Sequence, residues 1–210
     1  MEIQLDERIR AVFDALHERR ARESELANEL SREEFGARID EFMLPVGPEA
    51  GAFLYLLAIS AGASRFLELG TSVGYSTLWM AAAARRNGGH VTSLDTSANK
   101  TAQAQDNLAQ AGLAERVTCH TTDALAYLAG TDERYDFVLI DIWKDMYVPS
   151  LEAVAPLLLP GGIILADNMT FPESAQQHAQ AYRARVQSMT DFDSMLVPIG
   201  NGLEFSRRRP

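Results

Sequence analysis

The chain reads RFLELGTSVGYS from residue 65 to residue 76. The first five residues form a short apolar run, which is typical of a strand buried on both faces of a sheet. Gly70 and Gly74 follow it, and glycine lets the backbone turn tightly and approach a ligand. The residues after Gly74 have a helical pattern. The segment therefore predicts a strand, a glycine-rich loop and a helix.

The same alternation continues over the next hundred residues. Apolar runs rich in Val, Ile and Leu alternate with helical stretches, and stops at residues 87–89, 112 and 160–162 contain glycine. The predicted strands are residues 65–69, 90–94, 117–121, 135–141 and 162–166, and the predicted helices are residues 76–86, 97–111, 123–129 and 146–158. Such alternation predicts a parallel sheet with helices on both faces.

The last part of the chain has a different pattern. A helix over 174–189 is followed by a run at 194–199, a turn at Gly200-Asn201-Gly202 and a run at 203–207. Two strands joined by so short a turn must be antiparallel, because parallel neighbours need a long crossover. The predicted fold class is α/β, with a Rossmann-like, mostly parallel seven-stranded sheet that ends in an antiparallel C-terminal hairpin strand.

The first part of the chain is helical in pattern. An apolar stripe marks a first helix, at Leu5, Ile9, Val12, Phe13 and Leu16. A later helix can begin at Pro48 and end at Gly62. With 210 residues, we expect a single domain over 1–210, in which residues 1–42 are an N-terminal helical cap and residues 43–210 are the Rossmann-like core.

Composition excludes several classes of protein. The net charge is −10, which argues against a nucleic-acid partner, because phosphates are bound by clustered Lys and Arg. The chain begins without the pattern of a signal peptide and has no apolar run that could span a bilayer, so we expect a cytoplasmic protein without a membrane partner. The single cysteine, Cys119, is interpreted as a buried structural thiol. The four histidines lack ligand spacing and are interpreted as structural or exposed.

A ligand of an open α/β sheet binds at the carboxyl ends of the strands. The second strand ends at Asp95, whose carboxylate can accept both hydroxyls of a ribose. After the third strand, Asp123 either contacts an adenine amino group or only caps the next helix. Glu68 would repel a diphosphate and favour a sulfonium with an amino group, and the glycines do not spell G-x-G-x-x-G. The loop alone leaves a nicotinamide cofactor open as an alternative.

The fourth and fifth strands end in oxygen-bearing side chains. Asp141, Asp167 and Asn168 form an all-oxygen set that suits Mg²⁺, although each of them alone could be a helix cap. Lys144 can face the same pocket and take the proton of a substrate hydroxyl. The pKa of a phenol is about 10, and a bound divalent ion lowers it. Trp143 either belongs to the core or walls an aromatic substrate.

The stretch from Glu68 through Asn168 resembles the cation-dependent O-methyltransferases, which include catechol O-methyltransferase and the plant caffeoyl-CoA enzymes. The motifs that carry the resemblance are LGTSVGYS at 69–76, DIWKDMY at 141–147 and Asp167-Asn168. The resemblance implies a class I methyltransferase fold in which Asp141, Asp167 and Asn168 hold the ion. It also implies that Lys144, as the base, and Asp141 are the catalytic residues. The cofactor, S-adenosylmethionine, would be bound by Glu68, Gly70, Ser72, Gly74, Ser76, Asp95, Asp123, Ala124 and Asp141, with Ser76 on the methionine carboxylate.

Two departures from this family concern the methyl acceptor. The bacterial branch usually has Asp-Ala-Asp-Lys where this chain has residues 141–144, and an aspartate where Asn201 stands. The segment 169–173 is short, so it leaves few residues for a lid, and a small catechol-like phenol is expected rather than a CoA ester. The resemblance also suggests a homodimer. The alternatives are an NAD(P)-dependent oxidoreductase on a similar sheet and a non-catalytic S-adenosylmethionine-binding protein.

Overall fold

The computed structural model describes residues 3–210. Its strands are β1 (Arg65–Leu69), β2 (His90–Asp95), β3 (Val117–Thr121), β4 (Tyr135–Ile140), β5 (Leu158–Ala166), β6 (Phe192–Val197) and β7 (Leu203–Arg208). Its α-helices are α1 (Glu7–Glu29), α2 (Arg32–Ala37), α3 (Pro48–Ala61), α4 (Tyr75–Asn87), α5 (Ala98–Gln110), α6 (Ala124–Gly130), α7 (Tyr147–Val154) and α8 (Gln176–Gln187). Short 3-10 helices are η1 (Ile39–Glu41), η2 (Ala114–Arg116), η3 (Lys144–Met146), η4 (Ala155–Leu157) and η5 (Glu173–Ala175).

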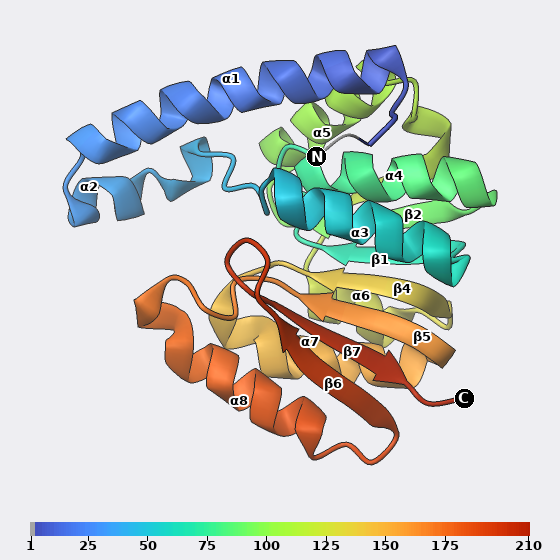
Figure 1. Cartoon of the computed structure of the whole chain (residues 1–210). Coiled ribbons are helices and arrows are strands. Elements are labelled where there is room, and N and C mark those ends of the chain that lie inside the picture. Colours follow the sequence, from blue (N-terminus) through green and yellow to red (C-terminus); the bar gives the residue numbers. More distant parts are fainter. Residues whose placement is uncertain (1–2) are drawn as a thin grey trace.

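The strands form one seven-stranded sheet in the order β3-β2-β1-β4-β5-β7-β6 (Figure 1). Strands β1 to β5 pair in parallel, whereas β7 is antiparallel to both β5 and β6. The predicted α/β fold, with its mostly parallel sheet and antiparallel C-terminal hairpin, is therefore confirmed.

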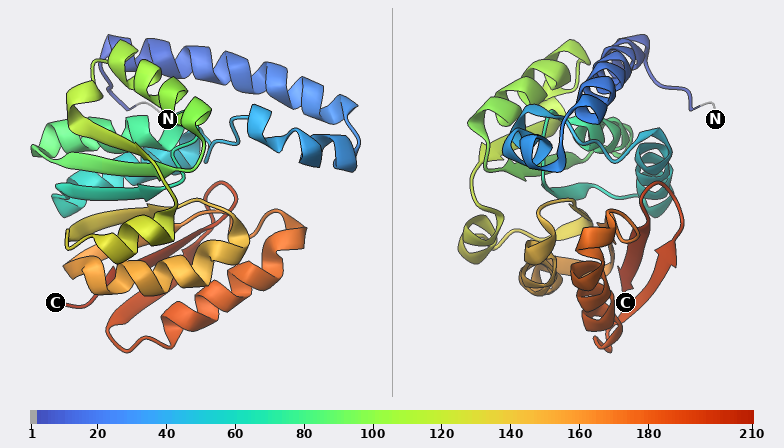
Figure 2. Two further views of the ribbon diagram at one scale, coloured as in Figure 1. Left: turned by 180° about the vertical axis from the view of Figure 1, so that it is seen from behind. Right: turned by 90° about the vertical axis from the view of Figure 1, so that its left-hand side faces the viewer.

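Helices cover both faces of the sheet, and successive strand residues point into opposite layers (Figures 1 and 2). In β4, Phe137 and Leu139 pack with α1, α3, α4 and α5, whereas Val138 and Ile140 pack with α6, α7 and α8. This period of two is what extended backbone requires. Because both faces are buried, the strands are apolar throughout, which is why the sequence shows them as continuous runs.

Helix α1 lies across α4 and α5 on one side of the sheet (Figure 2). Asp6 caps its start by accepting from the Arg8 backbone amide. The predicted apolar stripe is found. Leu5 packs against the core, and the other four members are buried, namely Ile9, Val12, Phe13 and Leu16. Residues 1 and 2 of the predicted cap lie outside the described residues. Over residues 3–210, no helix combines the length and apolarity needed to cross a membrane.

Helix α3 begins with Pro48 in its first turn and ends at Gly62 in the left-handed conformation, as the sequence predicts. Its packing on α4 depends on a second glycine. A Cβ atom on Gly51 would lie within 3 Å of three atoms of the Trp79 indole. The absence of a side chain at Gly51 therefore lets the two helices approach closely.

The prediction for β5 is wrong at its start. The sequence predicts a stop at residues 160–162 before the strand, but β5 runs from Leu158 through Ala166 and includes them. The pairing of β5 with β4 shifts register between Tyr135 and Phe137, so this part of the strand is irregular. An irregular segment accommodates proline and glycine, which a regular ladder excludes. The preceding helix also ends earlier than expected, at Val154, and η4 follows it.

Candidate functional site

The carboxyl ends of β2, β1, β4 and β5 lie side by side, because these strands are consecutive neighbours in the sheet. The polar residues that follow them therefore meet at one edge. Helices α1 and α2 project beyond this edge and overhang it (Figure 1). The candidate site is therefore the set of polar residues that follow these strand ends, on the side of the sheet toward which α1 and α2 project (Figure 1).

The loop after β1 follows a path that its glycines permit. Gly70 has φ +103°, and a Cβ atom there would lie 2.0 Å from the Asp141 carbonyl oxygen. Gly74 has φ +86° and forms the N-cap of α4. Gly70 thus brings the loop directly against the end of β4, where Asp141 begins the second polar segment.

Glu68 lies at the centre of a buried cluster of hydroxyl groups. The Ser76, Thr77 and Ser93 hydroxyls each donate to its carboxylate at 2.5 Å. Glu68 is fully buried, and this burial raises its pKa to about 7, although the three hydroxyls oppose the shift. The Ser76 hydroxyl, predicted to bind a methionine carboxylate, is engaged with Glu68 in this structure.

The two acidic residues after β2 and β3 are in different surroundings. Asp95 accepts from the backbone amides of Ser72, at 2.7 Å, and Ser97, at 2.8 Å. An ionised carboxylate has about four acceptor sites, so Asp95 keeps acceptor capacity for a ligand. Asp123 caps α6 by accepting from Ala126 at 2.9 Å and is exposed. Asp123 is therefore a helix cap, which is one of its two predicted roles. Contacts of Asp123 and Ala124 with a cofactor remain predictions.

Lys144 connects the residues that follow β4 and β5. Its ammonium donates to Asn168 Oδ1 at 2.5 Å and to the Tyr147 hydroxyl at 2.5 Å, and it lies 3.7 Å from Asp141 Oδ1. Burial lowers the pKa of Lys144, against the opposing effects of Asp141 and Asp167. Burial likewise raises the pKa of Asp141.

Tyr147 is a site residue to which the sequence assigned no role. It is fully buried in the first turn of α7, and its hydroxyl donates to the Asp167 backbone carbonyl at 2.8 Å while it accepts from Lys144. In the sequence, Tyr147 is the last residue of the motif DIWKDMY at 141–147, and nothing in that motif assigns it a contact. Its closeness to Lys144 in the chain is the one signal that could have indicated this contact.

The carboxylate of Asp167 is buried without a hydrogen-bond partner among the described residues, although the charge of Lys144 acts on it. Only 1% of the residue is exposed, and neither carboxylate oxygen has a hydrogen-bond partner among residues 3–210. Burial raises its pKa to about 8, and the neighbouring Asp141 adds to the shift. Within the described chain, no group of three or more His, Cys, Asp or Glu side chains could hold a metal ion. The set of two carboxylates and one amide nevertheless fits a hard divalent cation, because such ions prefer oxygen ligands and keep bound waters.

Unusual backbone conformations occur at the same edge. Among residues 3–210, the non-glycine residues with positive φ are Leu44 at 39°, Ser72 at 46° and Asn168 at 58°. This region is sterically costly for residues that have a Cβ atom, and such conformations persist where surrounding contacts hold them.

Large apolar side chains are exposed in the segments that border the site. Trp143 is 58% exposed and Phe171 is 61% exposed. The interpretation of Trp143 as a core residue is therefore wrong, and its role as a wall for a substrate remains open. Phe171 was not singled out from the sequence, because it lies in a short segment with no periodic pattern.

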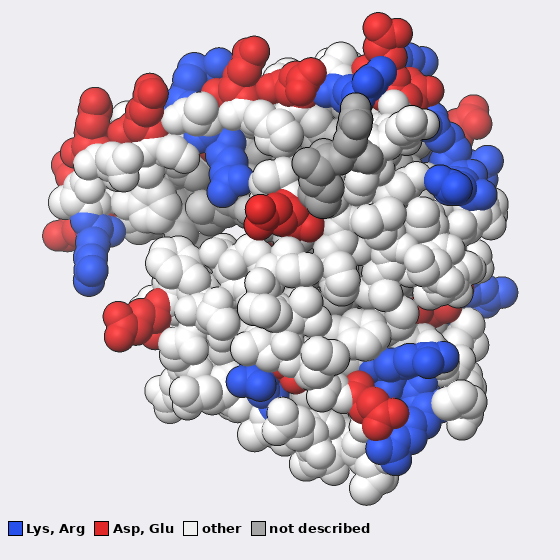
Figure 3. Space-filling model, viewed as in Figure 1, with Lys and Arg blue, Asp and Glu red and all other residues white. Residues whose placement is uncertain are grey.

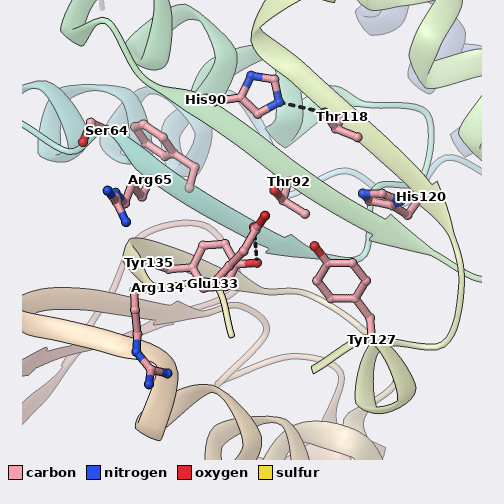
Figure 4. A pocket seen from close by; sticks show the side chains of 11 residues that line it. Ser64, Arg65, His90, Thr92, Thr118, His120, Tyr127, Glu133, Arg134 and Tyr135 are labelled. Carbon is pink, nitrogen blue, oxygen red and sulfur yellow. Dashed lines mark hydrogen bonds between the residues drawn. The ribbon is translucent and has the colours of Figure 1, made fainter. Parts of the chain in front are cut away.

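Two of the four histidines, His90 and His120, and the cysteine lie outside the site. A cavity of about 590 Å³ opens near the beginnings of β1, β2 and β4, and His90 and His120 line it together with Tyr127 (Figure 4). None of the predicted site residues contributes to this cavity. Cys119 is half-buried rather than buried, and partial burial raises the pKa of its thiol to about 12. The raised pKa disfavours the reactive thiolate, which agrees with the interpretation of Cys119 as a structural thiol rather than a nucleophile.

Comparisons with known proteins place this geometry in context. A family model described as O-methyltransferase matches residues 17–208. The chain is 34% identical over 167 residues to a catechol O-methyltransferase from Niastella koreensis, covering 73% of this chain and 75% of that protein. It is 27% identical over 210 residues to a putative caffeoyl-CoA O-methyltransferase from Arabidopsis thaliana, covering 89% and 88%.

Solved structures share the fold over nearly the whole chain. The O-methyltransferase TomG from Streptomyces achromogenes superposes with a TM-score of 0.78 at 22% identity, covering 100% of this chain and 93% of that one. An O-methyltransferase from Bacillus cereus in complex with SAH superposes with a TM-score of 0.75 at 24% identity, covering 99% and 93%. At these identities, the likeness supports the fold alone.

Proposed function

This chain belongs to the O-methyltransferase family, whose model spans residues 17–208, and from that membership we propose a magnesium-dependent enzyme that methylates one hydroxyl of a small catechol-like substrate. Membership of this family makes the chain an S-adenosylmethionine-dependent O-methyltransferase, whereas the metal and the substrate are part of the proposal. The oxidoreductase and the non-catalytic binding protein, both open on the sequence, are thereby excluded.

The observation that carries the proposed metal dependence is the buried carboxylate of Asp167, for which residues 3–210 provide no hydrogen-bond donor. A buried carboxylate without a partner is costly unless it is neutralised by a proton or by a cation. In the proposed enzyme, Asp141, Asp167 and Asn168 hold the ion through oxygen atoms. When it is bound, Mg²⁺ supplies positive charge that lowers the pKa of a substrate hydroxyl.

The remaining steps belong to the residues of the chain. Lys144 accepts the proton of the substrate hydroxyl at its Nζ, a role that its lowered pKa favours. Tyr147 and Asn168 orient Lys144 through the hydrogen bonds that they make to its ammonium. The substrate oxygen would then take the methyl group of S-adenosylmethionine as the sulfur–methyl bond breaks, with S-adenosylhomocysteine as the leaving group. Holding two reactants in line can supply about 7–11 kcal/mol of the barrier.

The proposed cofactor site is the edge formed by the ends of β1 and β2. Asp95 accepts hydrogen bonds from the ribose hydroxyls, and Glu68 lies near the positively charged end of the cofactor. The glycine loop supplies Gly70, Ser72, Gly74 and Ser76 to the same site, while the end of β3 supplies Asp123 and Ala124.

The proposed acceptor is a small vicinal dihydroxy aromatic compound. Two adjacent hydroxyls can bind one cation together, which suits an oxygen set that leaves positions open. The exposed rings of Trp143 and Phe171 offer apolar surface beside the site. The relatives named as catechol and caffeoyl-CoA enzymes support a phenolic substrate, and the short segment 169–173 favours a small one.

We further propose that the chain acts as one domain, with residues 1–42 as a cap over the core of residues 43–210, and that it forms a homodimer. The overhang of α1 and α2 supports the cap (Figure 1).

The metal dependence is tested by removing the ion and by removing a ligand. Methylation of catechol should cease in excess chelator and return with Mg²⁺. Asp167→Asn keeps the shape of the side chain and removes its charge, so it should weaken Mg²⁺ binding in calorimetry while S-adenosylhomocysteine binding remains. Asp106→Asn on α5, at an exposed position, is the matched control. Undiminished turnover in excess chelator would refute the metal dependence, whatever the outcome for the acceptor.

A further inference from the structure

Helix α1 is anchored by apolar contacts over its first half only. Its buried residues end at Leu16, and no residue from 17 to 29 is buried. This second half carries the helix past the cofactor edge of the sheet (Figure 1). Something other than hydrophobic burial must therefore position it.

Polar contacts connect this half of α1 to the elements beneath it. His17 Nε2 lies 2.8 Å from the hydroxyl of Tyr75, the first residue of α4. Arg19 donates to Gln103 of α5 at 2.7 Å and to Glu23 at 2.5 Å. The Glu23 side chain is 18% exposed.

The other oxygen of the Glu23 carboxylate fixes a peptide of the segment after η1. The Met43 backbone amide donates to Glu23 Oε2 at 2.8 Å. Met43 is 1% exposed, so loss of this acceptor would leave a buried amide without a partner. A hydrogen bond to a charged acceptor is stronger than one between neutral groups.

The same residue reaches the cofactor loop through its carbonyl oxygen. The Ser72 hydroxyl donates to the Met43 carbonyl at 2.9 Å, and the Ser72 amide donates to Asp95 at 2.7 Å. Ser72 has φ 46°, a conformation that needs such contacts to persist. A continuous path of hydrogen bonds therefore runs from Glu23 through Met43 and Ser72 to the proposed ribose acceptor, Asp95.

We propose that Glu23, oriented by Arg19, is a positioning residue for the cofactor site and couples the docking of α1 to cofactor binding. This rests on the proposed placement of the cofactor at Asp95 and the glycine loop. Glu23 acts through Met43 and Ser72. By linkage, a cofactor that requires this loop geometry also stabilises the docked position of α1.

The matched control for Glu23 lies on the same helix. Glu18 forms an i,i+4 pair with Arg22 at 3.9 Å, with side chains 76% and 68% exposed, so it offers a carboxylate in a helical ion pair without the contact to Met43. Glu23→Ala should weaken S-adenosylhomocysteine binding by about ten-fold in calorimetry, whereas Glu18→Ala should leave it unchanged. Glu23→Gln, which keeps an oxygen acceptor for the Met43 amide, should recover most of the loss.

Two readouts separate positioning from a general loss of structure. In hydrogen exchange, the Met43 amide should exchange faster in Glu23→Ala than in Glu18→Ala, and the cofactor should slow exchange over residues 17–29 of the unmodified chain. In kinetics, the KM for S-adenosylmethionine should rise in Glu23→Ala while kcat at saturation stays nearly constant, because Glu23 touches no reacting atom.

Equal affinity of Glu23→Ala and the unmodified chain for S-adenosylhomocysteine would overturn the coupling, even if the Met43 amide exchanged faster. An equal loss in Glu18→Ala would also overturn it, because the effect would then belong to helix charge. If the unmodified chain bound no S-adenosylhomocysteine, the proposed function would fail instead. The positioning role would then be decided by the Met43 and Ser72 amides, whose exchange must rise in Glu23→Ala.

Discussion

Lys144 donates to three neutral oxygen groups, of which one is the Ile142 backbone carbonyl at 3.1 Å, and faces two carboxylates. Asn168 and Tyr147 accept hydrogen bonds from its ammonium, while Asp141 and Asp167 favour the charged form electrostatically. Burial is the larger effect, so the pKa of the amine is lowered. A lysine whose pKa moves toward neutrality is better suited to accept a proton, because more of it is unprotonated at the working pH.

Replacing Lys144 with methionine keeps an apolar stem of similar length but removes the base. We expect Lys144→Met to lower kcat by about 10²–10⁴-fold, the usual contribution of general base catalysis. The loss should shrink for catechols with electron-withdrawing groups, which ionise without help. Lys100→Met on α5 is the control. Near-normal kcat of Lys144→Met on unsubstituted catechol would assign the base to another group.

Glu68 provides a prediction for the pH dependence of stability. Burial raises its pKa from 4.5 to about 7, so between these values the folded protein holds a proton that the unfolded chain releases. This carboxyl therefore contributes stability that is complete below about pH 4.5 and is lost as the pH rises through about 7. Without cofactor, the melting temperature should fall more between about pH 5 and pH 8 in the unmodified chain than in Glu68→Gln. An equal change of melting temperature with pH in the two proteins would contradict the raised pKa of Glu68.

The residues at the strand ends could be predicted from sequence, but their supporting contacts could not. Asp141 and Asp167 are recognisable because each directly follows a buried strand, and parallel strands bring their carboxyl ends to one edge. Glu23 lies 20 residues from Met43 along the chain. Nothing in the sequence distinguishes it from the other charged residues of its helix. Contacts of that kind depend on where the helix docks, which local periodicity does not determine.

At the scale of elements, α3 and α4 pack closely because Gly51 presents no side chain to Trp79. Indole atoms occupy the space where a Cβ atom of residue 51 would stand, with the nearest at 2.2 Å. Since Trp79 is 7% exposed, it has little freedom to move away without displacing the core.

A methyl group at Gly51 should therefore separate the two helices. We expect Gly51→Ala to destabilise the fold by about 1–3 kcal/mol, the usual effect of overpacking, and denaturant unfolding measures it. Gly36 in α2 is the control, because a Cβ atom there meets nothing within 4 Å. Gly36→Ala should leave the fold unharmed or stabilise it by up to about 1 kcal/mol through helix propensity. Equal stability of the two variants would refute the packing argument.

The start of β5 shows where sequence patterns mislead at this scale. Pro160, Gly161 and Gly162 have the composition of a turn, yet they lie inside a strand. Gly161 has φ +78°, a conformation that a glycine accepts within an irregular strand. Turn residues indicate a departure from regular geometry, and only tertiary pairing decides whether the chain then reverses or continues.

At the scale of the whole molecule, no helix within residues 3–210 covers part of one sheet face. Helices α3, α4 and α5 cover this side over β1 to β4, whereas β7 and β6 lie open beside α3 (Figure 1). Met195 on β6 is 58% exposed and Leu56 on α3 is 45% exposed. Figure 3 shows charged residues on α1 and α2 and, near the C-terminus, at the end of this face, where Asp193 of β6 pairs with Arg209, whereas the middle of the face is largely free of them.

We expect this face to form the proposed homodimer. Light scattering should give twice the chain mass of 23.1 kDa, and Met195→Glu or Leu56→Glu should shift the mass toward the monomer. Glutamate at these positions would bring like charges together across a twofold interface, which is unfavourable. A monomer mass for the unmodified chain at high concentration would disprove the homodimer and leave the catalytic assignment untouched.

The left-handed backbone at Leu44, Ser72 and Asn168 has a consequence for laboratory evolution. Glycine would relieve the steric conflict at each position, so selection for heat resistance alone should enrich glycine there. Selection for methyl transfer should retain Ser72, whose hydroxyl contacts Met43, and Asn168, whose side chain contacts Lys144. These positions would then show a trade-off between robustness and turnover. The frequency of glycine at each position under the two selections would distinguish residues needed for methyl transfer from residues that the fold only accommodates.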